Sequence, residues 1–526
     1  MFEISKDKLL LQSRIDPRSK SHNGNKTYSK YKNAFLSDFE RILFSSSLRR
    51  LQDKAQVYPL EMKDFARTRL THSLEVSSLA NSLGNIIVKR IHRMYNDLSV
   101  AHKSLKVSMN STKWIRVNNR INQKRSRNIK SLQDISICLQ CAALLHDIGN
   151  PPFGHFGEDV IKKYFFDIFY GDYKLLSEKH KIIFDTIKDQ QMINDLVHFD
   201  GNAQTIRIVT KLQNSTSKKY GLNLTLGVIG TLFKYPFSSI NATFKHEKFG
   251  YLYSENDLII KLKKFNKKRI WSVYQDNKRN PLSLIMEASD DIACTISDFD
   301  DAIQKGNIKF EDIYYISKNI NKFTSNYQKT SIERSKKFIS SIIRYYNRNA
   351  KKGIIEPLRN TVSRVLNKER ENFKESVAEC FINNYDDIMN GNFNSTLIEK
   401  SDEAEFYDFL YQIKKQFVFS QEEIIKAELQ GKKIINFLLA EFLNSALHKN
   451  FGEFIFDSTK AKNEHHKVLQ LISKNYVDVY KKSIENKKYV LLDEELYFRI
   501  RMIIDHICGM TDSYAKDAYI SLMGNK

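Results

Sequence analysis

The chain has 526 residues, of which 41% are hydrophobic, and it carries a formal net charge of +23. Such a length buries one large core or two to three smaller ones. Seven prolines and eighteen glycines interrupt the chain rarely, so long helices and a mainly α fold are expected. Because no run of 18 apolar residues and no apolar signal segment occurs, we expect no membrane partner and a cytoplasmic location.

The positive charge predicts an anionic partner, which could be a nucleic acid, a nucleotide or an acidic membrane surface. A genome-wide preference for Lys and Asn explains the same charge equally well. The five cysteines are sparse and odd in number, which excludes a disulfide framework. Cys138 and Cys141 form a CxxC pair inside an apolar helical run, so they are expected to be core residues and not zinc ligands.

The first half of the chain predicts an N-terminal arm and the start of a helical core. Residues 1–36 form the polar arm, and the apolar spacing within 36–56 and 73–95 indicates helices. Residues 99–131 read as an exposed insertion, because nine Lys/Arg and no acidic residue lie between Lys103 and Lys130. An apolar helix follows and ends at the sequence Gly-Asn-Pro-Pro, residues 149–152.

The second half predicts more helices around one irregular segment. A small irregular or β segment is expected near 222–256, followed by a helix over 282–304. We assign 37–305 to a catalytic core and 306–526 to a helical C-terminal region that packs on it. Near the C-terminus, two helices are expected on either side of Gly509.

Metal-ligand residue types occur at three separated places. His72 begins one predicted helix, His146 and Asp147 stand side by side at the end of another, and Asp290 lies in a third. Neighbouring residues on a helix point about 100° apart, so His146 and Asp147 reach one ion only at a helix end. Two imidazoles and two carboxylates leave open positions on an octahedral ion, which favours Mn²⁺, Mg²⁺, Co²⁺ or Fe²⁺ over structural Zn²⁺.

The segment HDIGNPPFGHFGE, residues 146–158, resembles the signature of the bacterial deoxyguanosine triphosphate triphosphohydrolases, a branch of the HD superfamily. Further blocks of this type occur in the family's order from about residue 37 onward. They are SSSLRRLQDKAQV, RTRLTHSLEVSSLA, FDGNAQTIRI, KYP, KFGYLYSE, EASDDIACTISD and GMTDSYAKDAY. The match is specific to this branch of the superfamily.

This resemblance implies a helical fold around a metal ion. It also implies hydrolysis of a deoxynucleoside triphosphate to deoxynucleoside and tripolyphosphate, with dGTP as the expected preferred substrate. It implies His72, His146, Asp147 and Asp290 as metal ligands. Asp291 is the alternative fourth ligand, but the row Asp290, Cys294 and Asp298 on one helical face favours Asp290. A homo-oligomer, commonly a hexamer, is also implied.

His155 and Glu158 are the expected catalytic pair. Their spacing of three places them on one helical turn, where a carboxylate can orient an imidazole. The resemblance implies that His155 acts at the α-phosphate or at the 5′-oxygen leaving group, with Glu158 tuning it. The alternative is that both side chains only cap the helix that follows.

The remaining expected site residues contact the substrate. A triphosphate needs fixed cations and hydrogen-bond donors, and the matching blocks offer Arg69, Asn202, Lys234, Tyr235 and Lys248. By resemblance, Gln56 reads the base edge, which suits a side-chain amide with both donor and acceptor. Asp298 likewise resembles a residue close to the sugar 3′-hydroxyl.

Two features leave alternatives open. Cys294 stands where the family usually has a tyrosine that faces the sugar and phosphate, which puts ribose discrimination in question. The insertion, with Trp114 at its centre, either binds single-stranded DNA or is a solvated loop. The alternative functions are an HD phosphohydrolase acting on another nucleotide, or a single-stranded nucleic-acid-binding protein with weakened activity.

Overall fold

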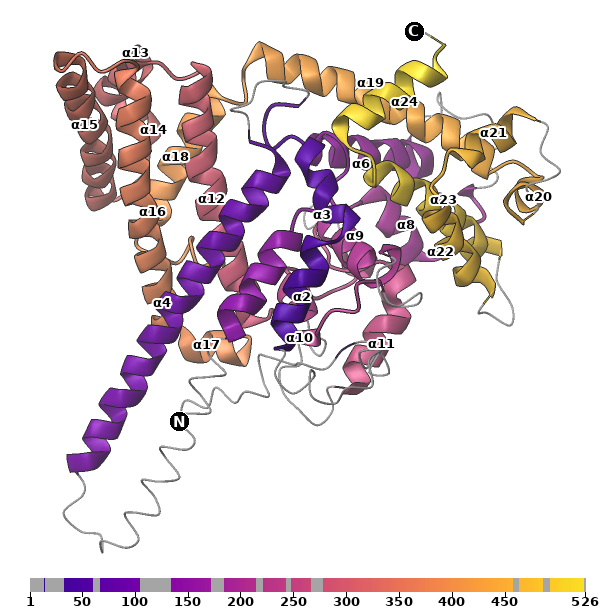
Figure 1. Cartoon of the computed structure of the whole chain (residues 1–526), viewed down its shortest axis with the longest axis horizontal. Coiled ribbons are helices and arrows are strands. Elements are labelled where there is room, and N and C mark those ends of the chain that lie inside the picture. Colours follow the sequence, from indigo (N-terminus) through magenta and orange to yellow (C-terminus); the bar gives the residue numbers. More distant parts are fainter. Residues whose placement is uncertain are drawn as a thin grey trace, which may run out of the picture.

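The protein is described by a computed structural model that places Arg14 and residues 33–59, 67–104, 134–171, 184–213, 221–242, 247–265, 278–456, 463–485 and 492–524. Helices dominate these residues, and their β pairing is limited to three isolated bridges, Arg14–Thr225, Ala55–Thr68 and Ser238–Tyr251. The expected mainly α fold is confirmed (Figure 1). No helix among the described residues is both long and apolar enough to cross a membrane.

The helical elements of the first half are short, with one exception. In chain order they are α2 (Ala34–Leu43), α3 (Ser46–Arg50), η2 (Leu51–Asp53), α4 (Arg69–Ser104), residues 134–145, α6 (Gly154–Tyr170), α8 (Gln190–Val197), α9 (Gly201–Arg207), the π-helical turn η4 (Ile208–Leu212), α10 (Leu226–Leu232), η5 (Ser239–Asn241), η6 (Tyr253–Glu255) and α11 (Asn256–Phe265). The exception is α4, the long helix at the lower left of Figure 1.

The structure changes two details of this half. The helical stretch expected over 36–56 is divided, because the Ser45 hydroxyl accepts a hydrogen bond from the Leu48 amide and starts a new helix. Helix α4 runs on to Ser104, so the first residues of the expected insertion are helical. The rest of the insertion, including Trp114, lies outside the described residues. The described residues of the segment near 222–256 are irregular apart from α10 and two short turns.

The second half contains long helices with several short ones between them. They are α12 (Pro281–Lys305), α13 (Phe310–Lys318), α14 (Ile320–Phe323), α15 (Lys329–Lys351), α16 (Pro357–Asn383), α17 (Tyr385–Asn390), α18 (Ala404–Phe417), α19 (Glu422–Ala446), α20 (Phe451–Phe456), α21 (Glu464–Gln470), α22 (Lys474–Glu485), α23 (Leu492–Cys508) and α24 (Asp512–Leu522). The helix over 282–304 and the helix break at Gly509 are therefore confirmed.

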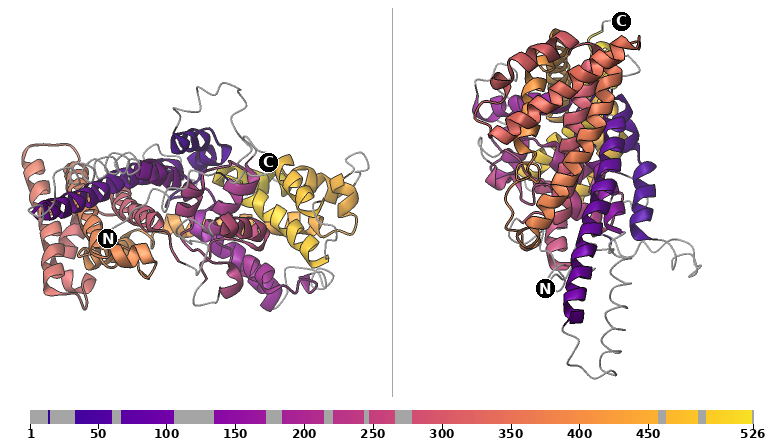
Figure 2. Two further views of the ribbon diagram at one scale, coloured as in Figure 1. Left: turned by 90° about the horizontal axis from the view of Figure 1, so that it is seen from below. Right: turned by 90° about the vertical axis from the view of Figure 1, so that its left-hand side faces the viewer.

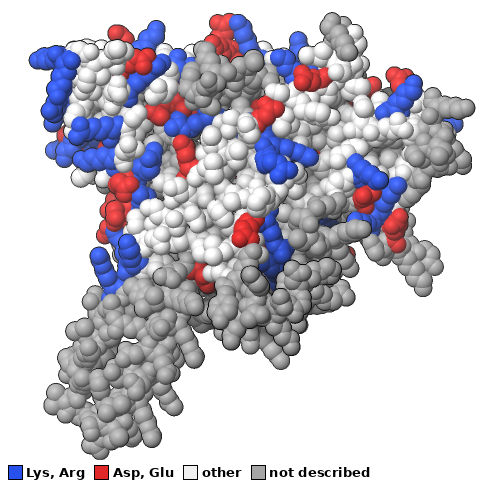
Figure 3. Space-filling view, in the orientation of Figure 1, with Lys and Arg blue, Asp and Glu red and all other residues white. Residues whose placement is uncertain are grey.

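Three long helices form the spine of the molecule. Helices α4, α12 and α16 contact one another and lie side by side in Figures 1 and 2. Helices α13, α14, α15 and α18 gather at one end of this spine, where Lys and Arg side chains cluster on the face shown in Figure 3. On the other side, α19 packs on α6 and carries α23 and α24.

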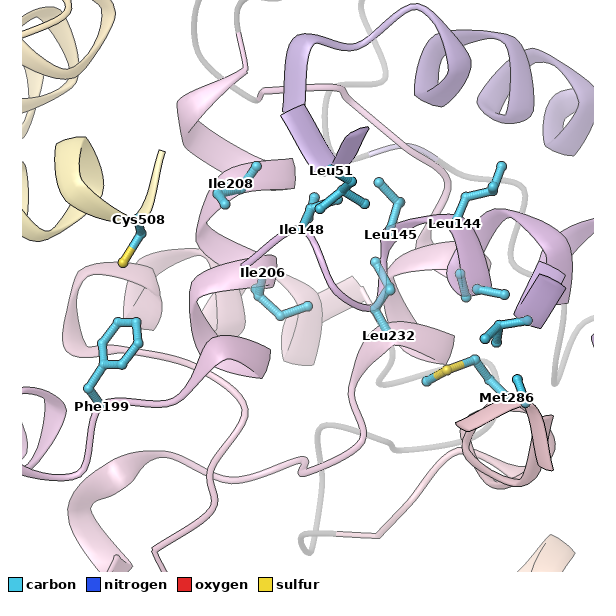
Figure 4. Packing of buried hydrophobic residues seen from close by; sticks show 14 of the residues in the cluster. Leu51, Leu144, Leu145, Ile148, Phe199, Ile206, Ile208, Leu232, Met286 and Cys508 are labelled. Atoms are coloured by element: carbon cyan, nitrogen blue, oxygen red, sulfur yellow. The ribbon is translucent and has the colours of Figure 1, made fainter. Parts of the chain in front are cut away.

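The helix over residues 134–145 runs through the centre of the core. Its Cys138 and Cys141 are fully buried free thiols, which confirms them as core residues. Leu144, Leu145 and Ile148 lie just before and after the His146–Asp147 pair, and all three are buried. Figure 4 shows them among apolar side chains that include Leu51, Ile206, Leu232 and Met286. This packing fixes the backbone that carries the two polar residues.

Candidate metal centre

Three expected ligands from three helical elements meet at one point. His72 Nε2 lies 3.0 Å from Asp290 Oδ1, and His146 Nε2 lies 3.4 Å from the same oxygen. Among the described residues, His72, His146 and Asp290 form the group whose potential ligand atoms all lie within 4.8 Å of one another. His146 Nε2 is buried and has no hydrogen-bond partner. A buried, unpaired nitrogen that faces a carboxylate is the arrangement expected of a metal ligand.

The local backbone explains how these residues are held. His72 lies in the first turn of α4, where its amide donates to the Thr68 carbonyl. His146 follows the helix of residues 134–145, and its Nδ1 faces the Ala143 carbonyl at 2.7 Å. At Gly149 the chain passes so close to α9 that a Cβ would overlap the backbone oxygen of Gly201. The turn that presents the His-Asp pair therefore requires glycine.

Asp147 stands beside this group and is engaged by other partners. Its Oδ2 accepts a hydrogen bond from Arg69 at 2.5 Å, and its Oδ1 accepts one from Asn150 at 2.7 Å. The same Oδ1 is 3.6 Å from His146 Nε2. Burial raises the pKa of Asp147, but the positive charges of Arg69, His146 and His72 together outweigh it and lower the pKa below its ordinary value. The carboxylate is therefore ionised and available to a cation.

The expected catalytic pair is formed. His155 Nδ1 lies 3.4 Å from Glu158 Oε2 on the first turns of α6. The His155 side chain is 75% exposed, whereas that of Glu158 is 3% exposed. The other oxygen of Glu158, Oε1, accepts a hydrogen bond from the Gly201 amide at 3.2 Å. The hydrogen bond and charge of Glu158 raise the pKa of His155, so the imidazole gains a proton more readily than a free histidine.

The expected triphosphate contacts are placed unevenly. Lys248 Nζ lies 3.8 Å from Glu158 and 3.6 Å from Asp200, next to the catalytic pair. Lys234 forms an ion pair with Glu287 at 3.1 Å and lies over the Tyr235 ring. Asn202 donates to Asp200 at 2.8 Å. Arg69, in contrast, is buried and paired with Asp147, which makes it a partner of the metal centre in this structure.

The two residues expected at the base and the sugar both keep one oxygen atom without a partner. Gln56 Nε2 lies 3.7 Å from Cys294 Sγ, while its buried Oε1 has no hydrogen-bond partner. Asp298 Oδ2 accepts from Lys414 at 3.2 Å, and its Oδ1 is buried and unpaired. Unpaired buried oxygen atoms favour an outside donor, such as a ligand hydroxyl or amine.

Several residues that support the site were not expected from the sequence. Lys54 is buried and donates to the backbone oxygens of Asn150 at 2.6 Å and Cys508 at 2.8 Å. The Asp512 carboxylate accepts from the amides of Ala55 at 3.0 Å and Phe153 at 2.9 Å. Asp512 lies in one of the blocks that resemble the family, so the sequence marked its position but did not indicate what the residue does. Lys54 gave no signal beyond its place in a matching block.

The comparisons with known proteins agree with this site. Residues 69–197 match the model of the HD domain, a segment that includes His72, His146 and Asp147. A deoxyguanosinetriphosphate triphosphohydrolase-like protein of Listeria monocytogenes is 33% identical over 498 residues, which cover 94% of each chain. Its counterpart in Listeria innocua is 34% identical with the same coverage. A deoxyguanosinetriphosphate triphosphohydrolase of Serratia proteamaculans is 29% identical over 93% of each chain. The chain therefore belongs to the HD-domain family of deoxyguanosinetriphosphate triphosphohydrolase-like proteins.

Proposed function

We propose that the protein hydrolyses deoxynucleoside triphosphates, with a preference for dGTP, to the deoxynucleoside and tripolyphosphate. The observation that carries this proposal is the convergence of His72, His146 and Asp290 on one point, with His146 Nε2 left unpaired there. The Serratia relative, which matches over nearly its whole length, is named for dGTP hydrolysis. The substrate and the products are inferences that extend this name to the present chain.

His72, His146, Asp147 and Asp290 would hold a divalent ion, with Mn²⁺, Mg²⁺, Co²⁺ and Fe²⁺ as the candidates. Such an ion, when bound, polarises a phosphoryl oxygen and lowers the pKa of a bound water. Arg69 keeps Asp147 ionised and fixes its orientation through their 2.5 Å contact. Lys248, Lys234 and Asn202 supply positive charge and hydrogen-bond donors for the triphosphate.

His155 serves as the proton donor to the leaving 5′-oxygen, and Glu158 positions it and keeps it protonated. Exposure of the imidazole leaves it free to reach a substrate, while the buried carboxylate holds its Nδ1. Gln56 Oε1 and Asp298 Oδ1 are the unpaired acceptors for the base and for the sugar 3′-hydroxyl. These roles are part of the same proposal.

The Glu158→Gln variant tests the pairing. Removal of the carboxylate charge lowers the pKa of His155, so the high-pH limb of kcat/KM shifts to lower pH. We expect kcat to fall by about 10²-fold, the lower end of general-acid contributions. The measurement is a pH–rate profile with dGTP. Asp159→Asn, one residue along α6 and exposed, is the control and should leave the profile unchanged. An unshifted limb in Glu158→Gln would remove Glu158 from this role.

Product analysis tests the reaction itself. Purified protein is incubated with each of the four dNTPs and with GTP, in Mn²⁺ or Mg²⁺, and the products are resolved by anion exchange. We expect deoxynucleoside and tripolyphosphate, with dGTP consumed fastest. Release of a nucleoside monophosphate and pyrophosphate would contradict the proposed reaction. Faster turnover of GTP than of dGTP would contradict only the preference for deoxyribose.

We also propose a homo-oligomer, a hexamer by family resemblance, and single-stranded DNA as a second partner of the basic insertion. The insertion lies mostly outside the described residues, so support for DNA binding comes from its sequence alone. Light scattering measures the assembly directly. A salt-dependent loss of affinity for an oligonucleotide is the result expected of phosphate contacts.

A further inference from the structure

Cys294 differs from the other cysteines in its surroundings. It lies one helical turn after Asp290 on α12 and is partly exposed, whereas Cys138, Cys141, Cys380 and Cys508 are buried. Its Sγ is 3.4 Å from Asp290 Oδ1 and 3.7 Å from His72 Nε2. Both of these atoms belong to expected metal ligands. A third polar atom near the sulfur is Gln56 Nε2, at 3.7 Å.

These distances fit atoms that share one ion. A thiolate binds zinc at about 2.3 Å and an imidazole at about 2.0–2.1 Å, so at the angles of about 90–120° found in a five-coordinate centre the two ligand atoms lie about 3.1–3.8 Å apart. The separations of Cys294 Sγ from Asp290 Oδ1 and His72 Nε2 both lie within this range. The expected ligand Asp147 is placed comparably, because its Oδ1 lies 3.6 Å from His146 Nε2.

A separate observation indicates that a ligand would be favoured beside the same carboxylate oxygen. The His146 side chain is 7% exposed, and its Nε2 has no hydrogen-bond partner although it lies 3.4 Å from Asp290 Oδ1. Cys294 and His146 thus approach the same carboxylate oxygen from two different elements. An ion bound at Asp290 Oδ1 would give His146 Nε2 the partner that it lacks in the protein, and it would lie on the side of the carboxylate that Cys294 Sγ approaches.

We propose that Cys294 is an additional ligand of the ion and makes this centre favour thiophilic ions, Zn²⁺, Co²⁺ or Fe²⁺, over Mg²⁺. Thiolate ligands select such ions, whereas sites built from carboxylates and water suit Mg²⁺ and Mn²⁺. The sulfur–metal bond forms as the thiol proton leaves to solvent. The inference rests on the metal centre of the proposed function, but it is independent of which nucleotide is hydrolysed.

Gln56 becomes a supporting residue in this arrangement. Its Nε2 faces the sulfur and can donate to it, which orients the sulfur and moderates its charge. Its Oε1 remains available to a substrate, since it has no partner in the protein. The metal centre and the base contact are thereby joined through a single side chain.

Cobalt provides a direct probe of the sulfur ligand. The metal-free full chain is titrated with Co²⁺, and the near-ultraviolet absorption is recorded for a sulfur-to-cobalt charge-transfer band. We expect the band in the wild-type protein and in the control Cys380→Ser, and we expect it to be absent in Cys294→Ser. Circular dichroism melts show that each variant is folded.

Metal affinities give a second measurement. In Cys294→Ser, Zn²⁺ and Co²⁺ should bind at least about tenfold more weakly, a loss typical of removing a group that supports a metal. Mg²⁺ affinity should change by less than about threefold, since a hard ion gains little from sulfur. Equal losses for all three ions would overturn the preference for thiophilic ions.

The outcomes separate this inference from the proposed function. Bound Co²⁺ without a charge-transfer band in the wild-type protein overturns Cys294 as a ligand and leaves the proposed metal centre intact. A band without hydrolysis of any dNTP supports the ligand and overturns the proposed substrate. If the folded protein binds no Co²⁺ at all, the sulfur ligand and the metal-dependent function both fail.

Discussion

Replacing Asp147 with alanine should abolish tight metal binding and lower kcat for dNTP hydrolysis by about 10³-fold or more. The expected ion contributes several kcal/mol to stabilising a phosphoryl transition state, and each 1.36 kcal/mol corresponds to a factor of ten in rate. Asp147 is one of two carboxylates in the expected ligand set and is held ionised by Arg69. Metal content after dialysis and turnover of dGTP are the two measurements. Asp159→Ala, which removes an exposed carboxylate, serves as the control.

The same variant has a consequence for stability that must be separated from catalysis. Arg69 is buried, and removal of its partner leaves an uncompensated charge that costs about 3–5 kcal/mol. The double variant Asp147→Ala/Arg69→Met removes both charges and should recover most of this free energy of unfolding, but not the metal. Hydrolysis that survives in folded Asp147→Ala would show that the ligand assignment is wrong.

The second large effect is expected at Asp505 on α23. Its carboxylate accepts from Arg207 at 2.6 Å and 2.8 Å, from Gln204 at 2.9 Å and from Arg501 at 3.3 Å, and all four residues are buried. Asp505→Ala leaves two buried guanidinium groups without this partner, so the free energy of unfolding should fall by about 3–5 kcal/mol. Urea unfolding followed by circular dichroism measures it.

The pH dependence of this loss has a defined sign. Burial raises the pKa of Asp505, but the charges of Arg207 and Arg501 outweigh burial and hold the pKa below its ordinary value. Stability from such a group is present above the unfolded pKa and is lost as the pH falls through the folded pKa. The difference in the free energy of unfolding between wild type and Asp505→Ala should therefore have its largest value at neutral pH and become smaller only in strongly acidic solution.

A matched control lies on the neighbouring helix α24. Asp517 is exposed, so Asp517→Ala should change the free energy of unfolding by less than about 0.5 kcal/mol. A loss in Asp505→Ala no larger than that of the control would mean that the buried arginines find other partners. In that case, the polar contacts of Asp505 would contribute little to holding α23 on the core.

Parts of the candidate metal centre could be predicted because the arrangement within each single element is local. The row Asp290, Cys294 and Asp298 follows from helix periodicity, and the helix end at His146 follows from the Gly-Asn-Pro-Pro sequence. The structure places Asp290 and Cys294 as this periodicity requires, with their side chains 3.4 Å apart. Spacing and the family pattern thus identified residues that the structure brings together, and their role as metal ligands stays a prediction.

The partners of those ligands could not be predicted, because they come from distant parts of the chain. Asp298 was expected at a sugar hydroxyl, yet one of its oxygens is occupied by Lys414, 116 residues away. Arg69 was expected at the triphosphate, and its contact with Asp147 was not foreseen. A lysine or arginine in a sequence looks the same whether it faces solvent or a buried carboxylate. Only the packing of α18 on α12, and of α4 beside the His-Asp turn, decides between them.

The contacts of Lys54 and Asp512 have a consequence for how the protein matures in a cell. The turn that follows the His146–Asp147 pair is linked to residues 508–512. The Lys54 side chain donates to the backbone oxygens of Asn150 and Cys508, and the Asp512 carboxylate accepts from the Phe153 amide. During synthesis the N-terminal part of a chain leaves the ribosome first, so this turn gains these contacts only after α23 and the start of α24 have been made. A chain that stops before residue 508 lacks these contacts, so we expect the proposed centre to form only once α23 and α24 have packed on the core.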